Sequence, residues 1–271
     1  YASPFDPSYK YAQNVTDGLN YIFSRAVVMD TDGDGIEDAL FFGEHLVYET
    51  SIAMMAIGAG SILEGAVLKP ELYSFVGPFR FPMRHGLTMG EMALIFDRGF
   101  SLGSNLEVVA MKGWRRRSLW PETGLRWVMP SPNMPVFETS QVYPGQVIWE
   151  GTNVSEGRGT TLPFELVGAP YWDCRHILAA LESTPLPGCC LRPLVFEPTS
   201  GKWAGQACAG FQLHVTDGAA FRPYRTSLAL LQAVLRLYPD QFHYKQPPYE
   251  YEFDRLPLDL ILGDGEVRRQ L

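Results

Sequence analysis

The segment from Trp149 to Thr160, WEGTNVSEGRGT, concentrates the side chains that carbohydrate chemistry requires. Carboxyl groups act as acid, base or nucleophile in glycoside hydrolysis, while amide and guanidinium groups hydrogen-bond sugar hydroxyls and carboxylates. We therefore assign catalysis to Glu150 and Glu156. Substrate binding is assigned to Asn153, Arg158 and Thr160.

Glycines and flanking residues indicate how this segment is held. Gly151, Gly157 and Gly159 let the backbone bend without a Cβ penalty. The preceding QVIW, residues 146–149, is typical of a strand end, so we expect a functional loop fixed to a sheet. The alternative is a solvated turn whose Ser and Thr side chains cap the next element.

Three further polar residues are candidates for substrate binding. Arg84 and His85 precede a predicted helix, where an arginine can bind a carboxylate in bidentate fashion. The alternatives are a salt bridge and a hydrogen-bonded structural histidine. Asn133, between two prolines, can present its amide to sugar hydroxyls or close an Asx turn. Lys202 and Trp203 are expected to face the same cleft.

An acidic stretch near the start, DTDGDGIED, resembles part of a calcium loop. Alternate carboxylates converge on a hard cation in such loops. Phe41 occupies the position where an EF-hand needs glutamate, which excludes an EF-hand. A shorter loop could hold a structural calcium ion, and an exposed acidic turn is the alternative. The candidate ligands are Asp30, Asp32, Asp34 and Asp38.

Composition restricts the class of protein. The 271 residues are 46% hydrophobic and 19% charged, as in a globular protein, and the net charge is −8. A nucleic-acid or anionic-membrane partner would require a basic surface, so neither is expected. No apolar stretch reaches the roughly 18 residues of a membrane span, and no signal peptide is visible. A bacterial periplasmic, secreted or cytoplasmic location fits equally, and no cofactor is required. Buried free thiols, rather than disulfides, are predicted for Cys174, Cys189, Cys190 and Cys208.

Helices are predicted from capping residues and apolar spacing. The capping box Thr88-Met-Gly-Glu91 opens a helix that Gly99 ends. Others are expected after Asp173, over residues 221–238 and from Pro257 onward. Nearer the start, two helical pieces are predicted around residues 13–26 and 48–59.

Strands are predicted between these helices, at residues 106–112, 189–196 and 207–215. Strands and helices interleave with loops of uneven length, without an internal repeat over residues 62–271. The predicted fold class is α+β (irregular α/β): a mixed sheet with flanking helices and a short helical N-terminal segment.

Residues 62–271 resemble the C-terminal half of the bacterial exo-β-N-acetylmuramidases, long catalogued as a family of unknown function. Several long motifs occur in the family's order. They are EGAVLKPELYSFVG (64–77), PMRHGLTMGEMA (82–93), VVAMKGWRR (108–116), PSPNMP (130–135), VYPG (142–145), EGTNVSEGRGTTLPFELVGAP (150–170), AGFQLHVTD (209–217) and PLDLILGDGEVR (257–268).

The resemblance implies release of terminal N-acetylmuramic acid from peptidoglycan fragments, with a muramic-acid sugar as the partner. It also implies a Rossmann-like N-terminal domain that holds the proposed catalytic glutamate and is largely missing here. Residues 62–103 match only its end, and residues 104–271 match the C-terminal domain. Residues 1–61 faintly resemble a prenyltransferase-like α/α-toroid repeat. The alternative function is a non-catalytic muramyl- or peptidoglycan-binding module, or an inactive fusion product.

Overall fold

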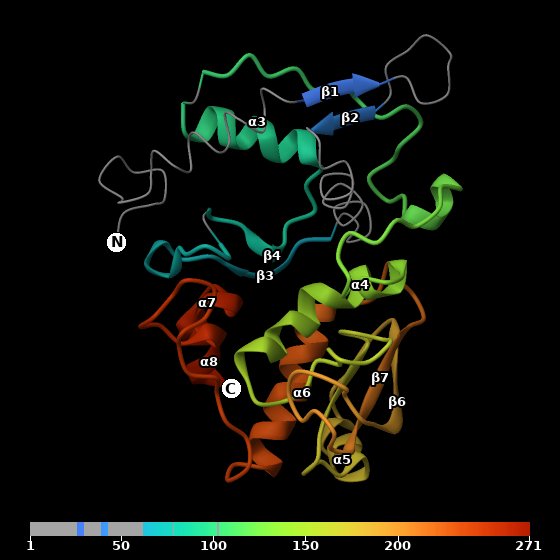
Figure 1. Cartoon of the computed structure of the whole chain (residues 1–271), viewed down its shortest axis with the longest axis vertical. Coiled ribbons are helices and arrows are strands. Elements are labelled where there is room, and N and C mark those ends of the chain that lie inside the picture. Colours follow the sequence, from blue (N-terminus) through green and yellow to red (C-terminus); the bar gives the residue numbers. More distant parts are fainter. Residues whose placement is uncertain (1–25, 30–38, 43–61, 78, 102) are drawn as a thin grey trace. The chain divides into compact units, whose positions relative to one another are not determined.

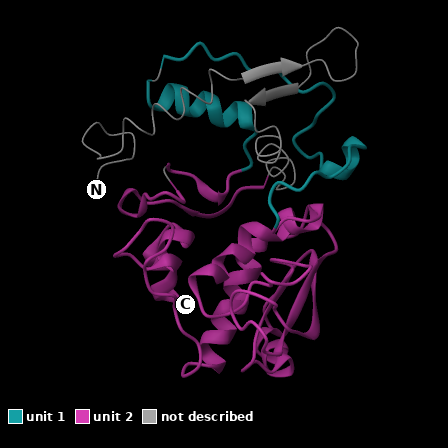
Figure 2. Cartoon of the chain, viewed as in Figure 1, with its two compact units in different colours: residues 1–61, 86–132 teal, residues 62–85, 133–271 magenta. Residues whose placement is uncertain are grey.

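The computed structural model describes residues 26–29, 39–42, 62–77, 79–101 and 103–271 (Figure 1). The chain divides into two compact units, each treated by itself (Figure 2). Unit 1 comprises residues 1–61 and 86–132, and unit 2 comprises residues 62–85 and 133–271. The predicted boundaries at residues 61 and 103 refer to family segments rather than compact units, so they stay a prediction.

The described part of unit 1 contains a pair of antiparallel strands and a capped helix. Strand β1 (Ala26–Met29) pairs antiparallel with β2 (Ala39–Phe42). Helix α3 (Met89–Gly99) confirms the predicted capping box, because Thr88 Oγ1 accepts the N–H of Glu91 at 3.2 Å and the Glu91 carboxylate accepts that of Thr88 at 2.9 Å.

Other predictions in this part of the chain have different outcomes. Residues 106–112, predicted as a strand, form neither strand nor helix. Val108 and Met111 are exposed there, and an extended apolar segment becomes a strand only when a neighbour completes its ladder. A 3₁₀ turn, η2 (Trp120–Thr123), follows. The acidic loop at residues 30–38, with the predicted calcium ligands, lies outside the described residues. So do the two predicted N-terminal helices, except for Ala26, which begins β1 instead.

A three-stranded antiparallel sheet forms one layer of unit 2, in the order β5-β7-β6. The predicted strands 189–196 and 207–215 are confirmed, and the α+β class with them. The prediction of a mixed sheet is wrong for the described residues, because each sheet there is antiparallel. The strands are β5 (Leu166–Ala169), β6 (Cys189–Phe196) and β7 (Cys208–Val215).

Helices pack on one face of this sheet (Figure 1). Alternation places Val167, Phe211 and Leu213 on that face, where they join the main core. The opposite face carries a smaller cluster around Phe196 and Cys208. The helices of unit 2 are α4 (Phe137–Gln146), α5 (Cys174–Leu181), α6 (Pro223–Leu237), α7 (Pro257–Leu262) and α8 (Gly265–Gln270).

The helices predicted in unit 2 are confirmed as α5, α6 and α7. Helix α4 is an additional helix that the sequence did not predict. Asp173 caps α5 by accepting the N–H of Arg175 at 2.8 Å. The stretch QVIW, predicted as a strand end, instead lies at the junction of α4 and the 3₁₀ turn η3 (Val147–Gly151). A short apolar run buried on every side has no periodicity that separates strand from helix.

A hairpin completes unit 2. Strand β3 (Glu64–Val67) pairs antiparallel with β4 (Pro82–Arg84), and η1 (Pro70–Leu72) lies in the connection between them. The Glu64 carboxylate accepts the N–H of Arg225 in α6 at 2.8 Å, which ties the hairpin to that helix.

Two further findings concern the described residues as a whole. No helix among them is long and apolar enough to cross a bilayer. The four cysteines are free, as predicted, but only Cys208 among them is buried. The predicted burial is wrong for Cys190, which is exposed because it lies on the outer side of β6, and Cys174 and Cys189 are half-buried.

Close helix packing gives the first prediction. A Cβ on Gly145 of α4 would lie 2.0 Å from the carbonyl oxygen of Pro223 in α6. Because backbone cannot move aside cheaply, Gly145→Ala should lower the free energy of unfolding by about 3 kcal/mol or more in urea titration. Gly265→Ala is the control, since its Cβ would meet only atoms at 3.5 Å. Equal stability of the two variants would contradict this account.

Candidate functional site

The segment Trp149–Thr160 is built into the core of unit 2 rather than projecting from a sheet. Trp149 is fully buried in η3. Ser155 exchanges two backbone hydrogen bonds with Gly168 of β5, at 2.9 and 3.0 Å. Gly159 has φ of +81°, and a Cβ there would meet the carbonyl oxygen of Ser200 at 2.4 Å. The expected bending at glycine is therefore confirmed, and it serves close packing.

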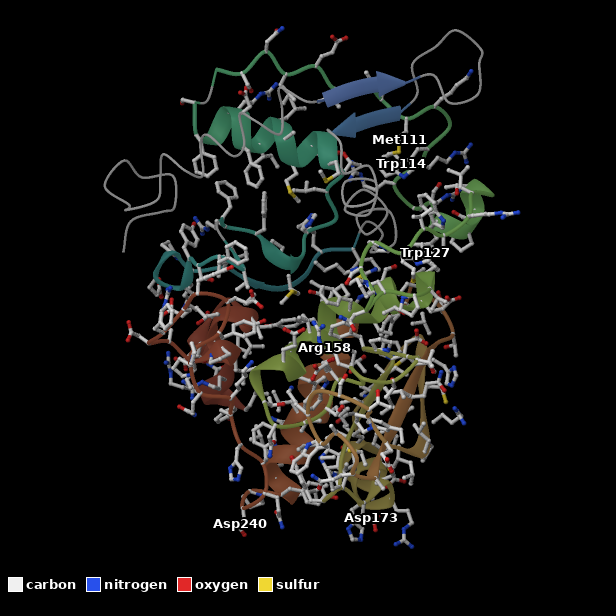
Figure 3. The ribbon with its side chains drawn as sticks, viewed as in Figure 1. Met111, Trp114, Trp127, Arg158, Asp173 and Asp240 are labelled. Atoms are coloured by element: carbon white, nitrogen blue, oxygen red, sulfur yellow. The ribbon has the colours of Figure 1, made fainter. Side chains whose placement is uncertain are left out.

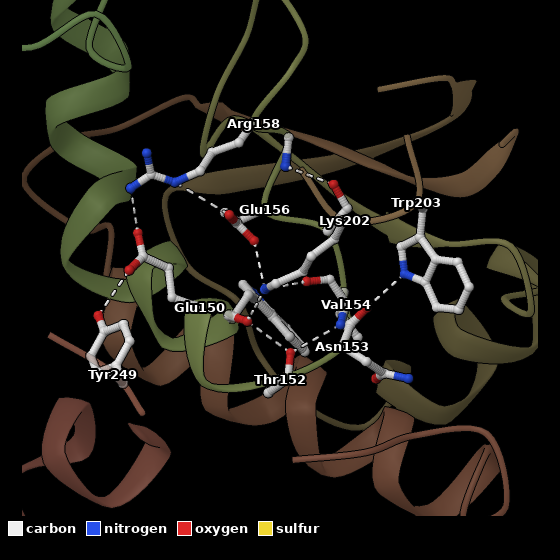
Figure 4. Close-up of polar contacts among 12 residues, drawn as sticks. Glu150, Thr152, Asn153, Val154, Glu156, Arg158, Lys202, Trp203 and Tyr249 are labelled. Carbon is white, nitrogen blue, oxygen red and sulfur yellow. Dashed lines mark hydrogen bonds and ion pairs between the residues drawn. The ribbon is translucent and has the colours of Figure 1, made fainter. Parts of the chain in front are cut away.

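Charged side chains of this segment form an alternating chain of ion pairs (Figure 4). Arg158 Nη2 lies 2.6 Å from Glu150 Oε1, and Arg158 Nε lies 3.3 Å from Glu156 Oε1. Lys202 Nζ lies 2.8 Å from Glu156 Oε2. Two carboxylates and two cations neutralise one another; we call these four residues the charge cluster.

Lys202 is the most constrained member of the charge cluster. Its ammonium donates to the carbonyl oxygens of Trp149 at 2.7 Å and Val154 at 2.9 Å, as well as to Glu156. These three bonds use all three of its donors. Burial lowers the pKa of Lys202, an effect that the charge of Glu156 opposes.

Tyrosines close the cluster on its other side. Tyr249 donates its hydroxyl to Glu150 Oε2 at 2.8 Å, and burial together with that carboxylate raises the pKa of Tyr249. Burial, followed by the charge of Glu150, also raises the pKa of Tyr143 to about 12. Both phenols therefore remain neutral near pH 7, and Tyr249 serves as a hydrogen-bond donor.

Asn153 connects the segment to the chain near the C-terminus. Its Nδ2 donates to the Gln241 carbonyl at 2.8 Å, and its Oδ1 accepts from the Tyr171 hydroxyl and the His243 N–H, each at 3.1 Å. The backbone N–H of Asn153 also donates to the His243 carbonyl at 2.9 Å. Trp203 Nε1 donates to the Asn153 carbonyl at 2.6 Å.

Backbone bonds continue this connection. The N–H of Lys245 donates to the Gly151 carbonyl at 2.9 Å, and Thr152 forms an antiparallel β-bridge with Tyr244.

Thr160 has a local role, because its Oγ1 donates to the Gly157 carbonyl at 2.6 Å and accepts the N–H of Leu162 at 3.1 Å. For Thr160 the capping alternative describes these contacts.

Arg84, His85 and Asn133 do not belong to the charge cluster. Arg84 is buried beside the carboxylate of Glu64 at 3.8 Å and donates to the Phe221 carbonyl at 3.3 Å, as the salt-bridge alternative expected. The His85 ring lies 5.7 Å from the ring of Phe81, and burial lowers the pKa of His85. Asn133 is half-buried and begins the second stretch of unit 2.

The contacts distinguish what each member of the cluster can do. Every oxygen of Glu150 and Glu156 already has a partner within the protein. Arg158 is the accessible member, with 40% of its side chain exposed. The cluster therefore presents a fixed guanidinium to solvent, and this geometry suits the binding of an anionic group. Sequence reasoning missed Tyr249 and Tyr171, because no spacing pattern links them to the segment.

A second prediction concerns Lys202. Lys202→Met leaves a buried carboxylate and two buried carbonyls without their donor, so the free energy of unfolding should fall by about 3 kcal/mol. Chemical denaturation measures this loss. Lys69→Met is the control, since it removes an exposed ion pair with Asp264 and should leave the midpoint within error. A Lys202→Met variant as stable as the control would show that the ammonium is dispensable.

A third prediction concerns pH. The pKa of His85 lies below its ordinary 6.5 in the folded protein, so between these values the unfolded chain binds more protons. The free energy of unfolding should therefore fall as pH drops below about 6.5. In His85→Gln this part of the slope should vanish, as measured by urea titrations from pH 7 to 5. The exposed His176→Gln is the control, and an unchanged slope in His85→Gln would contradict the assignment.

Two family models match most of the chain. The model described as exo-β-N-acetylmuramidase NamZ, N-terminal, matches residues 56–138, and that described as NamZ, C-terminal, matches residues 141–271. The peptidoglycan β-N-acetylmuramidase NamZ of Bacillus subtilis (strain 168) is 42% identical over 212 residues. This alignment covers 78% of the present chain and 49% of the relative.

Solved structures are similar as well. A DUF1343 family protein from Bacteroides fragilis NCTC 9343 has a TM-score of 0.70 and 30% identity, over 79% of this chain and 56% of its own. A second DUF1343 protein of that organism, at 23% identity and a TM-score of 0.53 over 79% and 55%, shares the fold. The chain thus spans about half the length of these relatives. The family predicted from the motifs is confirmed, and the chain belongs to the exo-β-N-acetylmuramidase NamZ family.

Proposed function

We propose that this chain serves in an exo-β-N-acetylmuramidase, which releases terminal N-acetylmuramic acid from peptidoglycan fragments. The observation that carries the proposal is the 42% identity to a peptidoglycan β-N-acetylmuramidase over 78% of this chain. The matched region includes the whole charge cluster, which lies within the C-terminal family match at residues 141–271.

Arg158 supplies the chemistry that this substrate requires. Muramic acid differs from glucosamine by a lactyl carboxylate, and a guanidinium binds a carboxylate through parallel N–H···O bonds. Glu150 and Glu156 hold Arg158 from two sides, so its orientation is fixed before the ligand arrives. We assign to Arg158 the recognition of the lactyl group.

Glu150 and Glu156 have a supporting role in this proposal. Glycoside hydrolysis needs one carboxyl to protonate the leaving oxygen and a second group as base or nucleophile. Since both oxygens of each glutamate are engaged, Glu150 and Glu156 orient the sugar through Arg158 or assist proton transfer. The resemblance assigns the principal catalytic glutamate to the family's Rossmann-like N-terminal domain, whose family model matches residues 56–138 here.

A muramyl-binding module without catalysis is the second candidate function. The engagement of all four carboxylate oxygens favours it, because a general acid must reach the glycosidic oxygen. A binding module needs only the accessible guanidinium and a fixed frame. Both candidate functions bind a muramic-acid sugar, but only the enzyme hydrolyses it.

Hydrolysis of a chromogenic β-linked muramide by the complete chain tests the proposal. Arg158→Ala should lower kcat/KM by about 10- to 100-fold, since it removes a charge-assisted contact. The effect should disappear when the lactyl carboxyl of the substrate is a methyl ester. Arg175→Ala is the matched control: Arg175 pairs with Asp173, which lies at the far end of unit 2 from Arg158 (Figure 3).

The glutamate variants separate the two functions. Glu150→Gln and Glu156→Gln should each lose more than about tenfold in kcat if either group takes part in proton transfer, because such groups contribute about 10²–10⁴. Smaller losses in both would exclude a catalytic role for the pair. Muramic acid binding without turnover by the wild-type chain would establish the binding module instead.

A further inference from the structure

Two tight turns of unit 2 hold aromatic rings in solvent. The turn Ser74–Gly77 is closed by backbone bonds of 3.1 and 3.2 Å and carries Phe75, which is 69% exposed. The turn Tyr249–Glu252 is closed by bonds of 2.8 and 2.9 Å and carries Tyr251, which is 79% exposed. The two rings meet edge to face with centroids 5.1 Å apart. Phe253, two residues after Tyr251 in the sequence, is 70% exposed, and we call these three residues the aromatic tip.

An arginine fixes the two turns to each other. Arg255 donates to the carbonyl oxygens of Glu71 at 2.6 Å and Tyr73 at 3.1 Å, next to the first turn. Its Nε also donates to the carboxylate of Glu252, in the second turn, at 2.8 Å. The spacing of the rings is therefore set by the fold before any partner arrives, which reduces the entropic cost of binding.

The second turn keeps side chains where glycine is favoured. Glu250 has φ of +44° and Tyr251 has φ of +63°, both in the left-handed region. Two-residue hairpin turns of this kind usually use Asn-Gly, because other residues are strained there. Strain of this sort concentrates at functional positions, and here it places the Tyr251 ring in water.

The size of the aromatic tip favours a small ligand over a protein. Its three rings expose on the order of 400 Å² together, whereas a stable protein interface buries about 800 Å² on each partner. Two exposed carboxylates, Glu250 and Asp254, lie beside the rings in the sequence. They accept hydrogen bonds from hydroxyl groups. The flat apolar faces of the rings can stack on the C–H face of a pyranose ring, while the neighbouring carboxylates accept hydrogen bonds from its hydroxyl groups.

The aromatic tip is linked to the charge cluster within unit 2. The turn that carries Tyr251 begins at Tyr249, whose hydroxyl donates to Glu150, the partner of Arg158. We propose that the aromatic tip is a second glycan-binding site, on which sugar rings of the peptidoglycan chain stack. This inference rests on the proposed function, which supplies the identity of the glycan.

Cosedimentation of the complete chain with purified peptidoglycan tests the proposal without any need for turnover. Tyr251→Asn combined with Phe75→Ser removes two rings, and Asn tolerates the left-handed backbone at residue 251. This variant should bind about tenfold more weakly than wild type. Tyr251→Phe combined with Phe75→Tyr retains both rings and should bind as wild type does. Val195→Ser removes an exposed apolar side chain from β6 and is the surface control.

The outcomes separate this inference from the proposed function. Equal binding by the Tyr251→Asn/Phe75→Ser variant and wild type would overturn the stacking site, as would a lack of wild-type binding. If this double variant instead changes only the molar mass in light scattering, the rings form a protein contact and the inference is also overturned. Should the double variant unfold, Phe253→Ser alone gives the same comparison. Failure of wild type to hydrolyse the chromogenic muramide, with binding intact, would overturn the enzymatic proposal alone.

Discussion

The ammonium of Lys202 is the interaction on which the segment Trp149–Thr160 depends. It gathers the carbonyls of Trp149 and Val154 and the carboxylate of Glu156 at one point. A half-buried cation whose three donors all point into the protein is tolerable only when its charge and its donors are matched, and these three acceptors meet both conditions. The glycine-rich backbone has little preference of its own, so the ammonium selects one conformation from many.

The other members of the charge cluster fix the position of Arg158, which is its most exposed residue. Glu156 contacts Lys202 with one oxygen and Arg158 with the other, so the position of Arg158 follows from the Glu156–Lys202 pair. Glu150 and Tyr249 complete the second side. Charges alternate along the series, so the half-exposed arginine and the three side chains that hold it carry no net charge together.

Local signals in the sequence predicted much of the fold. The capping box at Thr88 and the cap at Asp173 specify helix starts through contacts within a few residues, and both are confirmed. The strand predicted at residues 106–112 and the strand end at residues 146–149 are wrong, because apolar runs take their conformation from neighbours that the local sequence does not name.

The candidate site was only partly predictable for the same reason. The sequence located the polar segment and its four strongest side chains, and Lys202 was expected nearby. The sequence could not show that the carboxylate oxygens of Glu150 and Glu156 would all be bound by Arg158, Lys202 and Tyr249. Partners separated by long stretches of chain, such as Asn153 and Gln241, leave no spacing pattern to detect.

The link between Asn153 and residue 241 has a consequence for biosynthesis. These partners are 88 residues apart, so the ribosome makes Asn153 long before Gln241. Until Gln241 and His243 have been made, the Asn153 side chain lacks the acceptor and the donor that hold it. The polar segment therefore acquires its final shape well after its own synthesis.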